Sequence, residues 1–176
     1  MEQVLGVDHN EEQEFHRVRA VNRYATLTSA AKKALDEVTQ LAREIFNVEL
    51  ALVCFVDLHE VFVQSSSAGS IPGPADRTTT LCSRAIKSAE VTVINNKEME
   101  DYLLTNPLIA REQGLEFYAA APLITNEGLN IGTFCLLDSK NRSFFQGDKD
   151  ILARFSRIVM SALELCHSSI ITITAS

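Results

Sequence analysis

The chain has 176 residues and a mass of 19.5 kDa, with 16 Lys and Arg against 23 Asp and Glu, for a formal net charge of −7. This length is typical of one domain with a sizeable core, and 46% hydrophobic with 22% charged residues is typical of a globular protein. Positions 1–14 contain five of the acidic residues and no Lys or Arg, so the remaining chain is nearly balanced in charge. Neither part offers a basic patch, and we expect no nucleic acid and no membrane as partners.

Two helices are expected at the amino-terminal end. Residues 10–24 carry apolar side chains three or four positions apart, which predicts a polar helix with one apolar stripe. Residues 26–29 favour turns and helix caps, and residues 29–46 have the pattern of an amphipathic helix. Residues 1–22 are interpreted as an acidic helical leader that precedes the folded domain.

A central strand is expected over residues 50–56, because every position is apolar and both faces should therefore be buried. Residues 61–65 predict the returning strand of a hairpin. Residues 65–80 are rich in Ser, Gly, Pro and Thr and predict a surface loop whose length is typical of functional loops. The expected elements that follow are a short helix over 81–88, a short strand over 91–94 and an irregular stretch over 95–114.

The carboxy-terminal half predicts a hairpin and a helix. Residues 115–125 and 129–138 form two strongly apolar strands, separated by an Asn-Glu-Gly turn that favours tight antiparallel pairing. The last helix opens at Gly147 and keeps an apolar stripe as far as Cys166. Residues 167–176 are expected to be a tail that frays or marks a truncation. The order of elements predicts an α+β domain.

The spacing of the cysteines and the absence of targeting segments indicate the cellular compartment of the protein. Cys54, Cys82, Cys135 and Cys166 are far apart, without a CxxC pair, so neither a zinc ribbon nor a redox dithiol is encoded locally. Three of them lie in apolar runs and are expected to be buried, reduced thiols. No secretory signal and no run of about 20 apolar residues is present. We therefore expect a cytoplasmic protein.

Catalytic signatures are missing from the sequence. There is no GxGxxG, P-loop, HExxH, GxSxG or EF-hand pattern, and no His lies near a candidate nucleophile in the sequence. We predict no catalytic residue, no metal site and no enzymatic activity.

Four segments, in order, carry a family resemblance: RTTTLCSRAI at 77–86, YLLTNPLI at 102–109, FYAAAPL at 117–123 and IGTFCLLD at 131–138. Preceded by the helix-strand junction AREIFNVELALVCFVD, they resemble the GAF sensory domain, especially the bacterial type found before histidine kinases and diguanylate cyclases. The domain is placed at residues 23–166.

The resemblance implies a PAS-like fold and a place for a ligand. A central antiparallel sheet of five to six strands would carry the terminal helices on one face and a pocket roofed by crossover loops on the other. Small residues at 119–121 and 132 would let either a ligand or a helix approach the sheet, and both alternatives stay open. The pocket candidates are Leu81, Cys82, Tyr102 and Asn106 in the roof, with Phe55, Phe117, Ala119, Thr133 and Cys135 on the strands.

Three ligand-binding or catalytic subtypes of the family fit the sequence poorly. Asn96-Lys97 matches the cyclic-nucleotide pattern, but Ala121-Pro122 stands where that pattern has an Asp-Glu pair. Cys82 is followed by Ser83 rather than His, which argues against a covalent bilin. Free methionine sulfoxide reductases need loop cysteines, and residues 65–80 and 95–114 contain none. The ligand therefore remains unknown.

The function expected from the resemblance is sensory or regulatory. The domain would bind a small molecule non-covalently, or act as a homodimeric signal-relay module through its terminal helices, with an output domain or kinase as partner. The alternative is a thiol-dependent small-molecule reductase of the free methionine sulfoxide reductase type, using Cys82 or Cys135.

Overall fold

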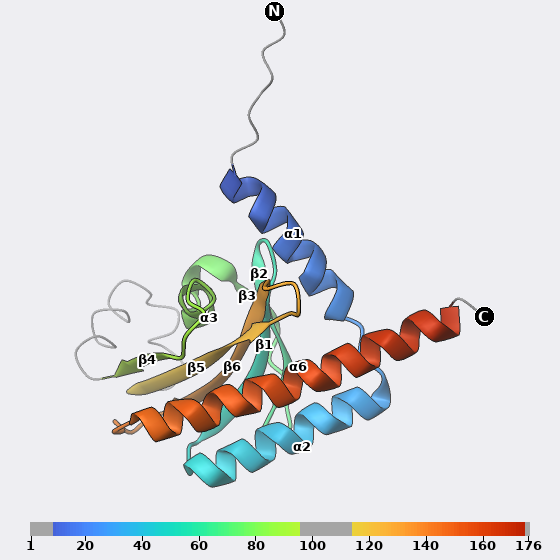
Figure 1. Cartoon of the computed structure of the whole chain (residues 1–176). Helices are drawn as coiled ribbons and strands as arrows, with labels where there is room; N and C mark the ends of the chain where they lie inside the picture. Colours follow the sequence, from blue (N-terminus) through green and yellow to red (C-terminus); the bar gives the residue numbers. More distant parts are fainter. Residues whose placement is uncertain (1–8, 96–113, 175–176) are drawn as a thin grey trace, which may run out of the picture.

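An antiparallel sheet of six strands, in the order β3-β2-β1-β6-β5-β4, organises the molecule (Figure 1). The computed structural model describes residues 9–95 and 114–174. The strands are β1 (Leu50–Val56), β2 (Glu60–Ser66), β3 (Ala75–Asp76), β4 (Thr92–Asn95), β5 (Phe117–Ile124) and β6 (Asn130–Asp138). The helices are α1 (His9–Tyr24), α2 (Ser29–Phe46), α3 (Leu81–Ala85) and α6 (Gln146–Thr174), with the 3-10 turn η1 at Arg77–Thr79. The predicted fold class is confirmed.

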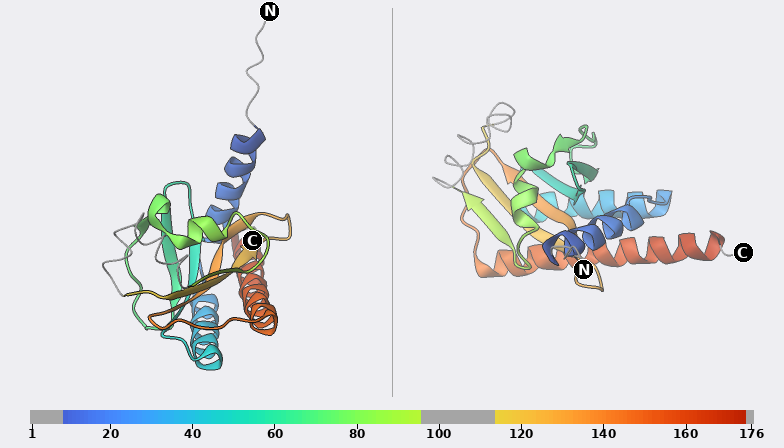
Figure 2. Two further views of the ribbon diagram at one scale, coloured as in Figure 1. Left: turned by 90° about the vertical axis from the view of Figure 1, so that its left-hand side faces the viewer. Right: turned by 90° about the horizontal axis from the view of Figure 1, so that it is seen from above.

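Helices cover the two faces of the sheet unequally. The long helices α2 and α6 run side by side in opposite directions across one face, and the short α3 lies over the other (Figures 1 and 2). The helix α1 extends from one end of the sheet, where it contacts β6 and β1. Both faces of the central strands are therefore buried, as the apolar run over residues 50–56 predicts.

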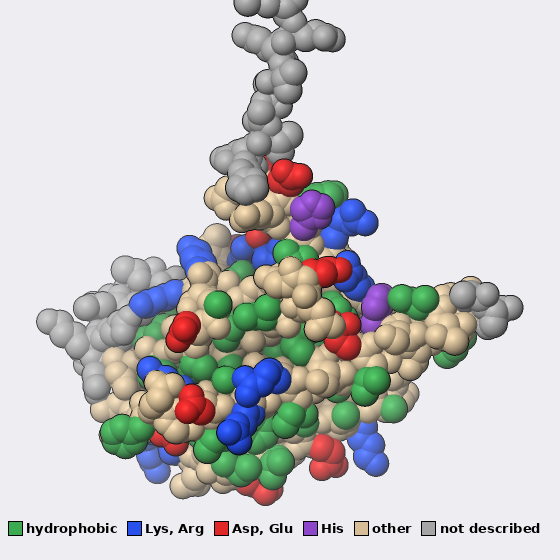
Figure 3. All heavy atoms as spheres, in the orientation of Figure 1, with side chains coloured by type: hydrophobic (Ala, Val, Ile, Leu, Met, Phe, Trp, Pro, Cys, Tyr) green, Lys and Arg blue, Asp and Glu red, His purple; other side chains and the backbone are tan. Residues whose placement is uncertain are grey.

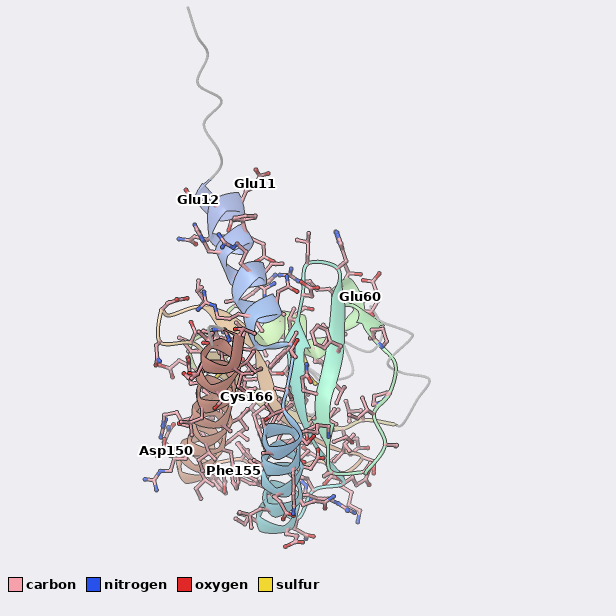
Figure 4. All side chains as sticks on the ribbon, turned by 90° about the vertical axis from the view of Figure 1, so that its right-hand side faces the viewer. Glu11, Glu12, Glu60, Asp150, Phe155 and Cys166 are labelled. Atoms are coloured by element: carbon pink, nitrogen blue, oxygen red, sulfur yellow. The ribbon has the colours of Figure 1, made fainter. Side chains whose placement is uncertain are left out.

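Alternate residues of each central strand enter two separate cores. Toward α2 and α6, Phe134 stacks on Phe155 with ring centroids 5.6 Å apart, and Phe155 also meets Phe46 at 6.0 Å. Figure 4 shows Phe155 on the side of α6 that is turned toward the interior. Toward α3, the core contains Cys54, Tyr118 and other buried side chains. We call these the helix-side core and the α3-side core.

Local signals in the sequence explain the ends of α2 and the β5–β6 hairpin. Thr28 caps α2 by accepting a hydrogen bond from the Ala31 amide, and Asn47 ends it in the left-handed conformation at φ 49°. Gly128 takes φ 81° in the turn and donates its amide to the Thr125 carbonyl at 2.9 Å. The predicted hairpin is confirmed.

The two ends of the chain differ from the expected division into leader, domain and tail. Ala20 and Val21 of α1 are fully buried in the helix-side core, so the expected boundary after residue 22 falls within a helix that is packed on the domain. The final helix does not end near Cys166 but continues to Thr174. No helix among the described residues is long and apolar enough to cross a membrane.

Arg17 and Glu14 attach α1 to the domain. The guanidinium of Arg17 donates to both carboxylate oxygens of Glu14 at 2.8 Å and to the carbonyl of Val56. Arg77 also pairs with Glu14. In contrast, Glu11 and Glu12 project from the start of α1 (Figure 4). Of the three acidic residues of α1, Glu14 is therefore bound to the domain.

Candidate functional site

The α3-side core is the candidate site, because it lies on the face that the family resemblance assigns to a ligand. Thr80 begins α3 by accepting a hydrogen bond from the Ser83 amide, and this turn directs Leu81 and Cys82 onto the sheet. Under α3, the sheet presents Cys54, Tyr118 and Cys135. The two residues of α3 and the three of the sheet are all buried, so the site is a core rather than an open cleft.

Three cysteines that are distant in the sequence meet here. The sulfur atoms of Cys54, Cys82 and Cys135 all lie within 4.8 Å of one another, and all three residues are buried. Strand register explains two of them: Cys54 of β1 pairs with Thr133 of β6, so Cys135, two residues further on, shares its face. The helix α3 supplies the third. We call Cys54, Cys82 and Cys135 the thiol cluster.

Hydrogen bonds make the three thiols inequivalent. Hydrogen bonds from Cys135, Cys54 and the Tyr118 hydroxyl, the last at 3.4 Å, hold the pKa of the Cys82 thiol well below its usual range although burial opposes this. Hydrogen bonds to Cys135 and Cys82, together with burial, raise the pKa of Cys54. Hydroxyl and thiol donors around the Cys82 sulfur therefore favour the thiolate form of this residue.

Cys135 and Tyr118 respond to that charge. The hydrogen bond from Cys54 lowers the pKa of Cys135. The hydrogen bond with Cys82 and burial together raise it by more, so the pKa of Cys135 lies above its usual range. Burial, followed by the charge of Cys82, raises the pKa of Tyr118. A second negative charge in the cluster is thus disfavoured.

Thr133 adds a hydroxyl to the same place. Its side chain is fully buried. The hydroxyl oxygen forms no close hydrogen bond within the described residues, and its weak interaction with the sulfurs lowers the pKa of Cys82 and Cys135. Sulfur is a weak hydrogen-bond acceptor, so the loss of water around this hydroxyl is only partly compensated.

The structure brings together four of the predicted site residues: Leu81, Cys82, Thr133 and Cys135 all lie in or against the α3-side core. Tyr102 and Asn106 lie outside the described residues.

Phe55, Phe117 and Ala119 require a correction. They lie in the helix-side core, on the face of the sheet opposite Cys82. The physical reason is the two-residue period of a strand, which sends neighbouring side chains to opposite faces. Phe55 cannot share a face with Cys54, nor can Phe117 share one with Tyr118. Ala119 therefore makes room for the helices, which decides between the two readings of the small residues at that position.

Cys54 and Tyr118 are the site residues that sequence reasoning missed. The two-residue alternation of a strand indicates them once the register between β1 and β6 is known. Because Thr133 and Cys135 face α3, the β1 residues on the same face are those at positions 52, 54 and 56. Register is a property of pairing, so the sequence of one strand does not contain it.

A hollow of about 890 Å³ lies elsewhere, between α6 and the end of β5. Pro122, Ile124, Arg157, Met160 and Glu164 are among the residues that line it, and none of the predicted site residues does. It is a groove with mixed lining and contains no cluster of chemically reactive groups.

The sheet order, the helix layer and the α3-side core together define a GAF domain, and the chain belongs to the GAF family. The family model, described as "GAF domain", matches residues 31–163. The chain is 28% identical over 159 residues to a Pseudomonas aeruginosa protein named cyclic di-GMP phosphodiesterase. That match covers 90% of this chain but 27% of the relative, so the chain spans about a quarter of the relative's length.

Solved structures show the same fold. The GAF domain of an Acinetobacter phosphoenolpyruvate-protein phosphotransferase superposes with a TM-score of 0.66 at 10% identity, covering 92% of this chain and 96% of that one. A type II free methionine-R-sulfoxide reductase from Thermoplasma acidophilum superposes with a TM-score of 0.62 at 13% identity, covering 77% and 94%. At these identities the likeness concerns the fold alone.

Proposed function

We propose that this chain is a regulatory GAF domain of a cytoplasmic signalling protein and that it relays its signal as a homodimer through α6 and α2. The observation that carries the proposal is a line of exposed apolar side chains on α6. Ile151, Ile158 and Leu165 are spaced seven residues apart and are 39%, 52% and 72% exposed. Seven residues make about two helical turns, so these side chains follow one line along the outer surface of the helix.

The neighbouring helix α2 also carries exposed apolar side chains. Leu41 and Ile45 of α2 lie one turn apart and are 50% and 54% exposed. The same helices bury their inner faces in the helix-side core, so they already have a packing partner on that side. Charged side chains of both signs are interspersed with apolar ones over the outer face (Figure 3). A mixed surface with an apolar line suits a second copy of the same helices, which would offer the matching line.

The proposed relay follows from the position of α6. This helix contacts β5 and β6, which carry Tyr118, Thr133 and Cys135, and it then extends past the sheet to Thr174 (Figure 1). A change in the α3-side core would thus reach α6 through two strands, and a shift in how α6 packs against its copy would carry the signal to an output domain or kinase. The much longer length of the Pseudomonas aeruginosa relative supports an output partner of this kind.

The dimer is tested by charge substitution on the apolar line. We expect the wild-type chain to be a dimer at about 10 µM and Ile158→Glu to weaken dimerisation by more than about 100-fold, as for a buried interface anchor. Light scattering coupled to gel filtration and sedimentation equilibrium measure this. Leu58→Glu is the matched control, because Leu58 is an apolar residue of similar exposure, 48%, in the turn between β1 and β2. A monomeric wild type, or a dimer that survives Ile158→Glu, would contradict the proposal.

The thiol cluster motivates the second candidate, a small-molecule reductase. Such a reaction would convert one methionine sulfoxide and two thiols into methionine, one disulfide and water. Cys82 with Cys54 or Cys135 could supply the two thiols, but all three are buried beneath α3. We therefore expect wild type and Cys82→Ser to consume reductant at the same background rate when free methionine sulfoxide is supplied. A wild-type rate that Cys82→Ser abolishes would favour the reductase instead.

A further inference from the structure

We propose that the thiol cluster is a three-sulfur binding site for a soft, thiophilic ion, and that trivalent arsenic supplied as arsenite is the ion it suits best. This proposal goes beyond the relay function and does not depend on it. The three sulfurs lie within 4.8 Å of one another. Bonds of about 2.3 Å to sulfur place the three sulfurs of a three-coordinate site about 3.3–4.0 Å apart, so small side-chain shifts would complete the site.

The donor set selects the class of ion. The cluster contains three sulfurs and no carboxylate or imidazole. Among the described residues, these three side chains are the group of potential metal ligands whose donor atoms lie close enough together to share one ion. Hard cations such as Mg²⁺ and Ca²⁺ need oxygen ligands, whereas thiolates select soft ions. The site is therefore unsuited to the common hard cations.

Charge balance then ranks the soft ions. The surroundings of the cluster are apolar, with Leu81, Ile94 and Ala120 in the same core. Three thiolates around a divalent ion leave one net negative charge, and around a monovalent ion they leave two. Around a trivalent ion they leave none, and a neutral complex avoids the cost of burying charge.

Arsenite also balances chemically. One As(OH)₃ and three thiols give As(SR)₃ and three molecules of water. Three As–O bonds break and three As–S bonds form, and each thiol proton leaves in a water molecule. Arsenic stays trivalent, so no oxidation state changes. Neither an oxidant nor a reductant is needed.

The buried hydroxyl of Thr133 is a second feature that suits a ligand at this place. It forms no close hydrogen bond within the described residues, and its weak interaction with the sulfurs of Cys82 and Cys135 lowers the pKa of both thiols. The Tyr118 hydroxyl already donates to the Cys82 sulfur at 3.4 Å. Two hydroxyl donors around metal-bound sulfurs would form the outer shell that such sites normally have.

The test uses the whole chain, reduced, freed of metal with a chelator and kept without oxygen. We expect native mass spectrometry after arsenite addition to show one arsenic gained and three hydrogens lost. Cys54→Ser, Cys82→Ser and Cys135→Ser should each weaken binding by at least about tenfold to 100-fold, the range that removal of outer-shell partners alone produces. Thr133→Val keeps all three sulfurs and should weaken binding about tenfold.

Cys166→Ser is the matched control. Cys166 is also buried, but it lies on α6 beside Thr28, far along the chain from the cluster and in the other core's helix layer (Figure 4). This variant should bind arsenite as the wild type does. Equal binding by Cys82→Ser and Cys166→Ser, a loss of only two hydrogens, or equal binding by the urea-unfolded chain would overturn the proposal.

A measurement on the wild type keeps the test decisive if a cysteine variant fails to fold. Arsenite should protect the three cluster thiols from alkylation and leave Cys166 at its original rate, as read by peptide mapping. Unchanged alkylation of all four thiols would overturn the proposal. Cadmium and copper(I) serve as comparison ions, and tighter binding of either than of arsenite would overturn the charge ranking. Because none of these readings requires a dimer, failure here and failure of the relay proposal are distinguishable.

Discussion

Gly132→Ala should lower the free energy of unfolding by more than about 3 kcal/mol, the largest loss that we expect from any single methyl group in this domain. A Cβ at this position would lie 2.0 Å from the carbonyl oxygen of Cys54 and 3.0 Å from the Cα of Phe55. These are backbone atoms of β1, which pairs with β6 at this point. The clash could be relieved only by separating two central strands.

Urea unfolding followed by circular dichroism measures this loss. Gly147→Ala is the control, since nothing lies within 4 Å of a Cβ there and the residue stands in the first turn of α6. We expect that variant to equal or slightly exceed the wild type, because alanine favours a helix over glycine by about 1 kcal/mol. Similar midpoints for the two variants would show that β1 and β6 can move apart at little cost.

Arg17→Met should cost about 2–3 kcal/mol, because it removes one partner of a mostly buried ion pair and leaves the other. Arg17 is 7% exposed and donates to Glu14 and to the Val56 carbonyl. Methionine keeps the length of the side chain without its charge. Arg19→Met is the control: Arg19 is exposed on the same helix, where it contacts the ring of Phe15. A loss below about 0.5 kcal/mol is expected there.

Acid titration gives Arg17→Met a second signature. The hydrogen bond from Arg17 lowers the pKa of Glu14 from 4.5 to about 2, against burial and with the help of Arg77. A carboxyl whose pKa is lower in the folded state contributes stability above its unfolded pKa and loses it as the pH falls toward its folded value. With the Glu14 side chain 30% exposed, we expect a contribution of about 1–2 kcal/mol after solvent screening.

The wild type should therefore lose this contribution between pH 4.5 and about 2, and Arg17→Met should lose less over the same interval. Unfolding midpoints measured at several pH values compare the two. Parallel pH profiles would mean that Arg17 stabilises α1 through packing and its carbonyl contact rather than through Glu14.

Sequence patterns within single segments were enough to predict most of the elements of the fold. The unbroken apolar run predicted β1 at its observed bounds, and the Asn-Glu-Gly turn between two apolar strands predicted the β5–β6 hairpin. The caps at Thr28 and Asn47 lie close to the expected ends of α2. Each of these signals depends on residues that are neighbours in the sequence, which is why they could be read without a structure.

Two features of the chain could not be read in that way. Residues 170–174 are all isoleucine or threonine, and such a run of β-branched residues disfavours a helix, yet α6 continues through them from its packed portion. The thiol cluster depends on the register between β1 and β6 and on the placement of α3. Cysteines 28 or more positions apart give no local sign that their sulfurs will meet.

The two outer strands of the sheet limit how copies of this domain can associate. Strand β3 has two residues, both exposed, and β4 has four. Beyond Thr92, the first residue of β4, the neighbouring strand β5 places Pro122, which has no amide hydrogen to offer to an incoming strand. Edge strands this short offer few backbone groups to an incoming strand, which lowers the tendency of the sheet to aggregate. In the dimer proposed above, the contacts would therefore be made by side chains of the helices rather than by backbone pairing, and a small rotation between the helices could be reversed.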